Sequence, residues 1–211
     1  TSKGNWIFDF GTNNTAEVKV NVNLPAGVKL TIRTGEEVYP DRDSVDFRST
    51  GAGIVPVQTD EYISGGTGME SWIPRGTYHG FRYAELTVSD PSIVPSKDWL
   101  QAVLVHTDLI RKGTFECAEP ILNRLHEMAL RTVQGNIVGV PMDCPTREKC
   151  GWLGDSHAYI KMAMDNYDMD NFLFKYMDDI RSTSSREEKN TLHHLMKNSQ
   201  FYFTDKAAGI P

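Results

Sequence analysis

The chain has few of the residues that mark disulfide-rich or zinc-binding proteins. Only three cysteines, Cys117, Cys144 and Cys150, occur among 211 residues, too few for a disulfide framework. Their spacing lacks the paired Cys-x-x-Cys of a zinc site. We therefore expect buried free thiols and no metal, with pairing of Cys144 and Cys150 on oxidation as the alternative. No cofactor is expected either.

Long apolar runs and basic clusters are also missing. No apolar stretch approaches the ~20 residues that a membrane-spanning helix needs, so we expect no spanning segment. Lys and Arg number 22 against 28 Asp and Glu, which gives a net charge of -6. This mildly acidic balance, without a basic patch, argues against nucleic acid as a partner. The chain begins at Thr1 without Met or a signal-peptide pattern, so a targeting segment is expected to be absent or already removed.

The first half of the sequence has the pattern of β-strands. Apolar and polar residues alternate between turn clusters, as in half-buried strands. The expected strands cover residues 5–10, 17–23, 28–34, 55–63, 81–88 and 100–106. Val18, Val20 and Val22 fall on one face of the second strand. This spacing fits an antiparallel sandwich.

The second half has helical periodicity. A helix is expected after Pro120, ending at Gly135, with an apolar stripe of Ile121, Leu122, Leu125, Met128, Ala129 and Val133. A second is expected from Asp155 or Ser156, as the cap, to about Asn166. A third, over 170–181, would turn Phe172, Leu173, Tyr176, Met177 and Ile180 inward, and a fourth would cover 187–197.

The order of these elements predicts separate domains. All the strands come before all the helices, which argues against alternating βαβ units. We therefore expect a β-sandwich domain over 1–90, a linker with one strand over 91–113, and a helical domain over 114–211.

One stretch near the middle carries the chemistry: Asp143-Cys-Pro-Thr-Arg-Glu-Lys-Cys-Gly-Trp-Leu-Gly-Asp155. It sets three carboxylates, Asp143, Glu148 and Asp155, beside Arg147 and Trp152. Carboxylates accept hydrogen bonds from hydroxyls, Arg donates in a fixed fork, and an indole packs against the apolar face of a sugar. The alternative is a surface loop with ordinary ion pairs. Pro and Gly that fix the backbone, and a Trp that is costly to expose, favour a site.

This stretch resembles the signature of α-L-rhamnosidases of glycoside hydrolase family 78. The flanks are similar too: 113–126 resembles the start of the family's first barrel helix, 72–83 the end of its sandwich, and Asp9-Phe-Gly11 the sandwich's opening strand. The resemblance runs over most of residues 5–180. It implies an antiparallel β-sandwich followed by the first helices of an (α/α)6 barrel, incomplete in this chain.

The resemblance also implies an activity and roles for the residues. The family removes rhamnose from carbohydrates with inversion, which needs an acid and a base. Glu148 aligns with the general acid, and the rhamnose-binding residues align with Asp143, Arg147, Trp152 and Asp155. From the residues alone, Glu148 would sooner form an ion pair with Arg147 or Lys149. A glycan-degrading enzyme fits the periplasm or secretion, although the sequence does not fix the compartment.

Three or four helices cannot close a toroid of about twelve. The apolar residues Met128, Leu130, Met162, Met164, Phe172 and Phe174 would otherwise face water, at roughly 25 cal/mol per Å². We therefore expect the rest of the barrel, with the general base, after Pro211, and an inactive isolated fragment. The alternative is a complete small protein with a helical cap. Asp165, Asp168 and Asp170 are expected to solvate a helix junction and not to act as the base or bind calcium.

Three features leave alternatives open. His157 departs from the pattern of many family members and could serve as the base of a rhamnose-glucuronate lyase, an architecture similar to this one. The opposing interpretation is a helix-terminal residue packed on Tyr159. Aromatics in the sandwich could make a noncatalytic carbohydrate-binding module, but Trp72, Tyr78, Phe81 and Tyr83 are expected in the core, with His79 unassigned. His193-His194 is expected to be a helix-surface pair.

Overall fold

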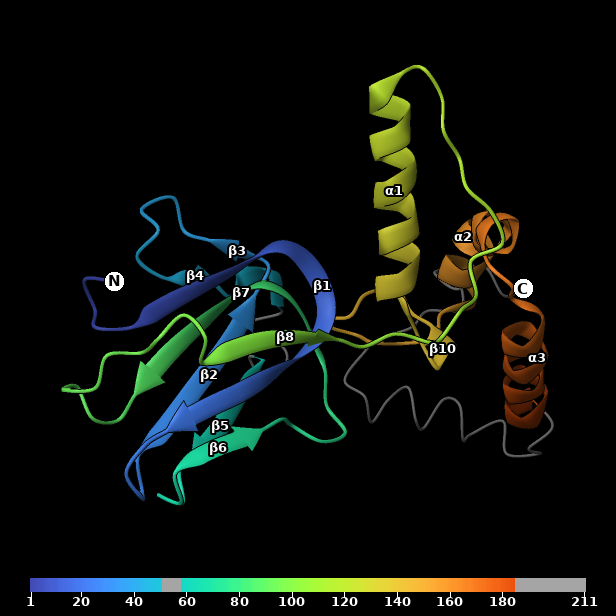
Figure 1. Ribbon diagram of the computed structural model, residues 1–211. Helices are drawn as coiled ribbons and strands as arrows, with labels where there is room; N and C mark the ends of the chain where they lie inside the picture. The colour runs from blue at the N-terminus through green and yellow to red at the C-terminus, as the bar shows by residue number, and fades with distance from the viewer. Residues whose placement is uncertain (51–57, 185–211) are drawn as a thin grey trace. The chain divides into compact units, whose positions relative to one another are not determined.

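The computed structural model describes residues 1–50 and 58–184. It divides into two compact units. The β unit comprises Thr1–Val105 together with Cys144–Lys149, and the helical unit comprises His106–Asp143 together with the residues from Cys150 onward. Figure 1 shows the large sheet in the first and the long helices in the second.

The β unit is built on one antiparallel six-stranded sheet. Its order is β5-β2-β7-β1-β6, and β8 also pairs with β1. The strands are β1 (Trp6–Asn23), β2 (Lys29–Gly35), β5 (Thr59–Ile63), β6 (Met69–Trp72), β7 (His79–Val88) and β8 (Leu100–Leu104). The predicted order of an antiparallel β part followed by helices is confirmed (Figure 1).

The long strand β1 organises this sheet. Its first part pairs with β7, from Trp6 opposite Leu86. After a register shift between Asp9 and Asn14, it pairs with β7 again as far as Ala16, and its remaining residues pair with β8 and then β6. The sequence predicted two strands, at 5–10 and 17–23, where the structure has one. Of the residues between them, Asn14–Ala16 are paired with β7, and the irregularity before them includes Gly11, whose φ of 79° suits glycine.

The core of the β unit lies on one face of the sheet. Val18, Val20 and Val22 are buried, as their alternation predicts. They share a cluster with Leu30, Ile32, Phe81, Ala84, Leu86 and Leu100. The predicted aromatic core is confirmed at Phe81, which is buried, and at Trp72, which packs against the cluster.

A small hairpin, β3 (Glu37–Val38) and β4 (Val45–Asp46), precedes the 3-10 turn η1 (Arg48–Thr50). The buried carboxylate of Glu85 on β7 accepts a hydrogen bond from the backbone N–H of Val45, at 3.0 Å. It also accepts one from Asn5 Nδ2, at 3.0 Å. These bonds hold the hairpin and the N-terminal segment onto the sheet.

The helical unit contains α1 (Pro120–Gly135), α2 (Leu153–Asn166) and α3 (Asp170–Ser184). The short pair β9 (Ile137–Val138) and β10 (Val140–Pro141) lies between α1 and α2 in the chain. Glu119 caps α1 by accepting from Ile121 N, and Pro120 takes the first helical position, where proline is tolerated. The buried cluster holds Leu130, Val133, Ile137, Ala163, Tyr167, Met169 and Phe172.

The apolar stripe predicted for α1 is present, but most of it is not covered by the described residues. Ile121 is 67% exposed and Met128 59%, and Leu122 and Leu125 are also exposed. Only Val133 of that stripe is buried, together with Leu130. Periodicity correctly found an apolar face, but the described neighbours cover only the C-terminal end of α1. On α3, the prediction that Met177 points inward is wrong, because Met177 is 61% exposed, whereas Phe172 and Tyr176 are buried as predicted.

The start of α2 also differs from the prediction. The helix begins at Leu153 with Trp152 at its N-cap, so Asp155 and Ser156 lie in the first turn. Neither caps it, because the Ser156 hydroxyl donates back to Trp152 O at 3.0 Å. The same hydroxyl lies 3.1 Å from Tyr176 OH and joins α2 to α3.

Some predictions concern residues outside the described ranges. These are the helix at 187–197, His193-His194, the chain end at Pro211 and the first residues of the strand at 55–63. Within 1–50 and 58–184, no helix has the length and apolar character needed to cross a membrane.

Candidate functional site

The predicted signature is divided between the two units. Cys144–Lys149, with Arg147 and Glu148, belongs to the β unit. Asp143 and the residues from Cys150 onward, with Trp152 and Asp155, belong to the helical unit. Different residues hold each of these two parts in place.

In the β unit, Pro145 and Thr146 pack against the backbone of Gly80 on β7. A Cβ atom at residue 80 would lie 2.6 Å from Thr146 Cγ2 and 2.7 Å from Pro145 Cγ. Both distances are far below van der Waals contact. The Cys144–Lys149 loop therefore sits against this strand only because residue 80 lacks a side chain.

Gln58 fixes Gly80 from the side of β5. Its side-chain carbonyl accepts from Gly80 N, and its amide donates to Gly80 O, both at 3.0 Å. The same amide also contacts Thr34 O at 3.4 Å. Gln58 is buried, so these bonds satisfy backbone groups that water does not reach.

Arg147 is anchored within the β unit. Its guanidinium donates to the carbonyl of Ser49 in η1 at 3.3 Å, and the side chain is exposed. One donor of the guanidinium is thus engaged by the protein. Arg carries five donors in all, which leaves capacity for a polar ligand.

Lys149 has the most constrained position in the loop. Its φ of 54° lies in the left-handed region. Its ammonium donates to Tyr78 O at 2.5 Å and lies 4.6 Å from the centroid of the Tyr78 ring. Burial lowers the pKa of Lys149, while Cys144 and Asp60 oppose that shift. Glu148, which is half-buried, lies between the anchored Arg147 and Lys149.

His79, which the sequence left unassigned, is buried at the start of β7. Its Nε2 lies 3.0 Å from Asp60 Oδ2, and both side chains are less than a tenth exposed. The pair joins β7 to β5 directly beside Gln58 and Gly80. The pair therefore supports the end of β7 that carries Gly80, on which the Cys144–Lys149 loop packs.

In the helical unit, Asp143 and Cys150 bridge the base of that loop. The N–H of Cys150 donates to Asp143 Oδ1 at 3.0 Å, and Asp143 N donates to Cys150 O at 3.2 Å. Trp152 N also donates to Cys150 O at 3.0 Å. The carboxylate predicted to bind sugar hydroxyls therefore also has a structural bond.

Trp152 and Asp155 lie at the N-terminus of α2. The indole is half-buried, and Asp155 is exposed in the first turn, where the helix dipole favours a negative charge. Burial, followed by the neighbouring Tyr176, raises the pKa of the Tyr159 hydroxyl, and Asp155 adds to this shift. His157 is exposed, so the predicted packing against Tyr159 does not bury it.

The structure thus brings Arg147 and Glu148 together in one unit and Asp143, Trp152 and Asp155 together in the other. The sequence interpretation missed the supporting residues Tyr78 and Gly80. A signal was present, because an isolated glycine within a strand pattern marks a close backbone approach.

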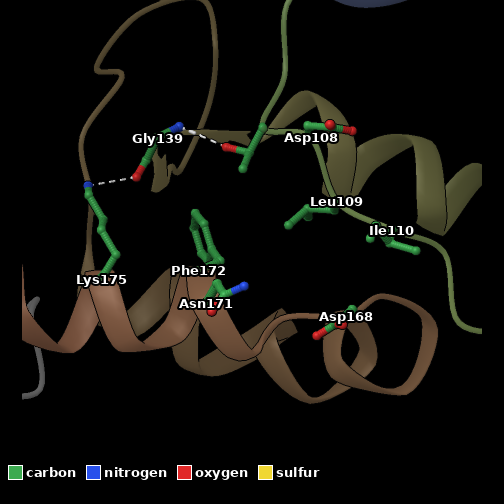
Figure 2. A pocket seen from close by; sticks show the side chains of 9 residues that line it. Asp108, Leu109, Ile110, Gly139, Asp168, Asn171, Phe172 and Lys175 are labelled. Atoms are coloured by element: carbon green, nitrogen blue, oxygen red, sulfur yellow. Dashed lines mark hydrogen bonds between the residues drawn. The ribbon is translucent and has the colours of Figure 1, made fainter.

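A pocket of about 370 Å³ lies elsewhere in the helical unit (Figure 2). It is lined by Thr107, Asp108, Leu109, Ile110, Gly139, Asp168, Asn171, Phe172 and Lys175. Lys175 Nζ donates to Gly139 O at 2.9 Å across one side of it (Figure 2). No residue of the signature lines this pocket, so it is separate from the predicted site.

The acidic residues near the α2–α3 junction are engaged locally. Asp165 pairs with Lys161 at 3.0 Å on the surface. Asp168 Oδ1 accepts from Asp170 N at 3.3 Å. Both fit the predicted solvated helix junction. Throughout the described part of the chain, no three His, Cys, Asp or Glu side chains gather as ligands of a metal ion would.

Two domain families match this chain in succession. Residues 1–106 match the bacterial alpha-L-rhamnosidase concanavalin-like domain. Residues 110–204 match the bacterial alpha-L-rhamnosidase 6 hairpin glycosidase domain. An alpha-L-rhamnosidase of Formosa agariphila is 44% identical over 182 residues, which cover 86% of this chain and 19% of that protein.

Solved structures agree. The Streptomyces avermitilis alpha-L-rhamnosidase, crystallised with L-rhamnose, is 31% identical with a TM-score of 0.79 over 88% of this chain and 18% of that one. The Dictyoglumus thermophilum alpha-L-rhamnosidase is 35% identical with a TM-score of 0.76, over 84% and 20%. The chain thus spans about a fifth of the length of these relatives. By sequence and by fold, it belongs to the α-L-rhamnosidases of glycoside hydrolase family 78.

Proposed function

We propose that the chain is part of an inverting α-L-rhamnosidase that removes terminal α-L-rhamnose from glycans or glycosides. The observation that carries this proposal is the 44% identity to an alpha-L-rhamnosidase over 182 residues. The predicted acid and ligand-binding residues supply the types of side chain that the reaction needs.

Glu148 is the general acid in this proposal. Its carboxyl proton passes to the glycosidic oxygen as the bond from that oxygen to C1 of rhamnose breaks. A water molecule, deprotonated by a second carboxylate, attacks C1 from the opposite face and gives β-L-rhamnose. In an inverting enzyme the two carboxyl groups stand ~6.5–9.5 Å apart, which leaves room for the water.

The remaining signature residues bind the sugar. Asp143 and Asp155 accept hydrogen bonds from rhamnose hydroxyls, and Arg147 donates to ring or hydroxyl oxygens. Trp152 covers the apolar face of the ring and excludes water from it. Asp143 has a second carboxylate oxygen besides the one that accepts from Cys150 N, so the structural and binding roles are compatible.

The general base comes from a later part of the barrel, after Pro211. The exposed apolar face of α1, with Ile121, Leu122, Leu125 and Met128, is the surface that further helices would cover. The same proposal includes a division of the chain into a sandwich (1–90), a linker (91–113) and the first part of the catalytic domain (114–211). The isolated chain is accordingly inactive.

Replacement of Glu148 tests this function. In the full-length protein, Glu148→Gln should lower kcat on an alkyl α-L-rhamnoside by ~10²–10⁴-fold, because positioned acid catalysis contributes that much. Glu37→Gln, at an exposed carboxylate of β3, is the matched control and should leave kcat unchanged. NMR spectra recorded early in the reaction should show β-L-rhamnose as the first anomer formed. A full rate in Glu148→Gln would reject the acid role.

A second candidate is a lyase acting on rhamnose linked to glucuronate. The observation that favours it is His157, which is exposed near the N-terminus of α2 and able to act as a base. Elimination would yield an unsaturated uronate that absorbs in the near ultraviolet, whereas hydrolysis yields a saturated one. Rhamnose binding by the full-length protein without turnover would instead indicate a noncatalytic carbohydrate-binding module.

A further inference from the structure

Lys149 adopts a backbone conformation that its side chain does not favour. Its φ of 54° places a residue with a Cβ atom in the left-handed region, where glycine or asparagine is the usual choice. A lysine persists in such a position only when its surroundings offset the cost. The contacts of its side chain supply that compensation.

Those contacts are made with a single residue, Tyr78. The Lys149 ammonium donates to Tyr78 O at 2.5 Å and lies over the Tyr78 ring, 4.6 Å from its centroid. A hydrogen bond from a charged donor is stronger than a neutral one, and the ring face adds attraction. Tyr78 directly precedes β7, which begins at His79. Lys149 is therefore tied to the residue that immediately precedes this strand of the sheet.

Two further anchors act on the other side of Glu148. Arg147 donates to Ser49 O at 3.3 Å, and Thr146 packs on Gly80 at the same end of β7. The backbone before and after Glu148 is thus fixed to the β unit. The left-handed conformation of Lys149 also fixes the direction of the backbone immediately after Glu148. Loss of the contacts between the Lys149 side chain and Tyr78 would allow the backbone to take another direction there.

We propose that Lys149 is a positioning residue, which holds the carboxyl of Glu148 in place for proton donation by anchoring the loop to Tyr78. This inference rests on the proposed function, in which Glu148 is the acid. It makes the β unit a working part of the catalytic machinery.

A competing role for Lys149 is purely electrostatic. Its positive charge, next to Glu148 in sequence, would then act on the proton affinity of the acid. Removal of the charge would shift the alkaline limb of the rate-against-pH profile and leave kcat at the optimum unchanged. A positioning residue acts differently, because a misplaced acid donates its proton poorly at every pH.

The test compares substrates that differ in their need for an acid. In the full-length protein, Lys149→Met should lower kcat on an alkyl α-L-rhamnoside by about 10–10²-fold, the effect of a small misplacement. On dinitrophenyl α-L-rhamnoside, whose leaving group needs no proton, the loss should be far smaller. The affinity of the variant for L-rhamnose, measured by calorimetry, should stay close to that of the unmodified protein. Retained binding also shows that the variant is folded.

Two more variants complete the test. Lys149→Gly relieves the left-handed strain but lacks the ammonium, so it should lose activity in the same leaving-group-dependent way. Lys175→Met removes another lysine that donates to a carbonyl, that of Gly139 at 2.9 Å, and should retain full activity.

The outcomes separate this inference from the proposed function. If Glu148→Gln loses activity on the alkyl rhamnoside while Lys149→Met and Lys149→Gly keep it, the positioning role is overturned and the acid assignment stands. A shift of the pH profile without loss at the optimum also overturns it. If Glu148→Gln keeps full activity, the proposed function itself fails.

Discussion

Asp143 and Cys150 exchange two hydrogen bonds across the ends of a six-residue loop. Cys150 N donates to Asp143 Oδ1 at 3.0 Å, and Asp143 N donates to Cys150 O at 3.2 Å. The loop between them, Cys144–Lys149, carries Glu148. The geometry of its base therefore depends on a carboxylate that the sequence predicted only as a ligand for sugar.

Two replacements of Asp143 should separate its structural role from its binding role. Asp143→Ala removes the acceptor for Cys150 N and should lower the free energy of unfolding by about 1 kcal/mol, the net contribution of a typical hydrogen bond. Asp143→Asn keeps an acceptor oxygen and should stay near the stability of the unmodified protein. If the other oxygen binds rhamnose, Asp143→Asn should still raise KM. Urea unfolding and steady-state kinetics measure the two effects, and equal stability of both variants would exclude the structural role.

Gly80→Ala should displace the loop from the sheet. The new Cβ would lie 2.6 Å from Thr146 Cγ2 and 2.7 Å from Pro145 Cγ, so one of the two segments must move. Overpacking of this kind costs about 1–3 kcal/mol of stability. We expect a lower thermal midpoint and, in the full-length protein, reduced kcat.

Gly113→Ala is the matched control for that change. Nothing lies within 4 Å of a Cβ at residue 113, and its φ is not in the left-handed region. It should be neutral or slightly stabilising, because alanine reduces the conformational freedom of the unfolded chain. Equal destabilisation by both variants would mean that the close contact at Gly80 does not seat the loop.

Glu70 on β6 should make stability sensitive to acid. Hydrogen bonds from Thr67 N, then from the Tyr62 and Ser64 hydroxyls, lower the pKa of its carboxyl to about 2 from 4.5. A carboxyl with a depressed folded-state pKa stabilises the fold above the unfolded value and loses that contribution as pH falls through the folded value. Glu70→Gln should therefore be less stable than the unmodified chain at pH 7, and the gap should close between pH 4.5 and about 2. A gap in thermal midpoint that stays constant over this range would contradict the assignment.

Two apolar residues of α1 should respond differently to truncation. Leu130→Ala, at a buried position, should cost about 2–5 kcal/mol in chain 1–211. Met128→Ala, 59% exposed, should cost little there. In the full-length protein, if further helices cover this face, Met128→Ala should also lower stability. A neutral Met128→Ala in both would count against a barrel packed on α1.

The sequence was sufficient where a pattern repeats over several residues. Alternation in β1 located the buried face of Val18, Val20 and Val22, and periodicity located α1 between Pro120 and Gly135. Prediction from the sequence failed where contacts with residues far along the chain determine the local structure. Asn14–Ala16, between the two predicted halves of β1, are strand because β7 pairs with them. Only the C-terminal end of the apolar stripe of α1 is buried, because the described neighbours reach only that end of the helix.

For the candidate site, the sequence identified the residue types but not their supports. Asp143, Arg147, Glu148, Trp152 and Asp155 were selected because they lie close together in one stretch. Cys144–Lys149 groups with the β unit because of contacts with residues that are far away in the sequence. The carbonyl of Tyr78 is a backbone atom, which any residue could supply, so no local pattern marks it. The assignment of the five residues stays a prediction, and the Glu148 and Asp143 variants test two of them.

The bare backbone at Gly80 has a consequence for protein engineering. Chimeras that graft the helices of this protein onto a foreign N-terminal sandwich would bring along Cys144–Lys149, yet leave behind the strand on which that loop rests. To hydrolyse a substrate whose leaving group needs a proton, such a hybrid would need two features in the foreign sheet. These are a glycine and an available backbone carbonyl at the equivalent positions.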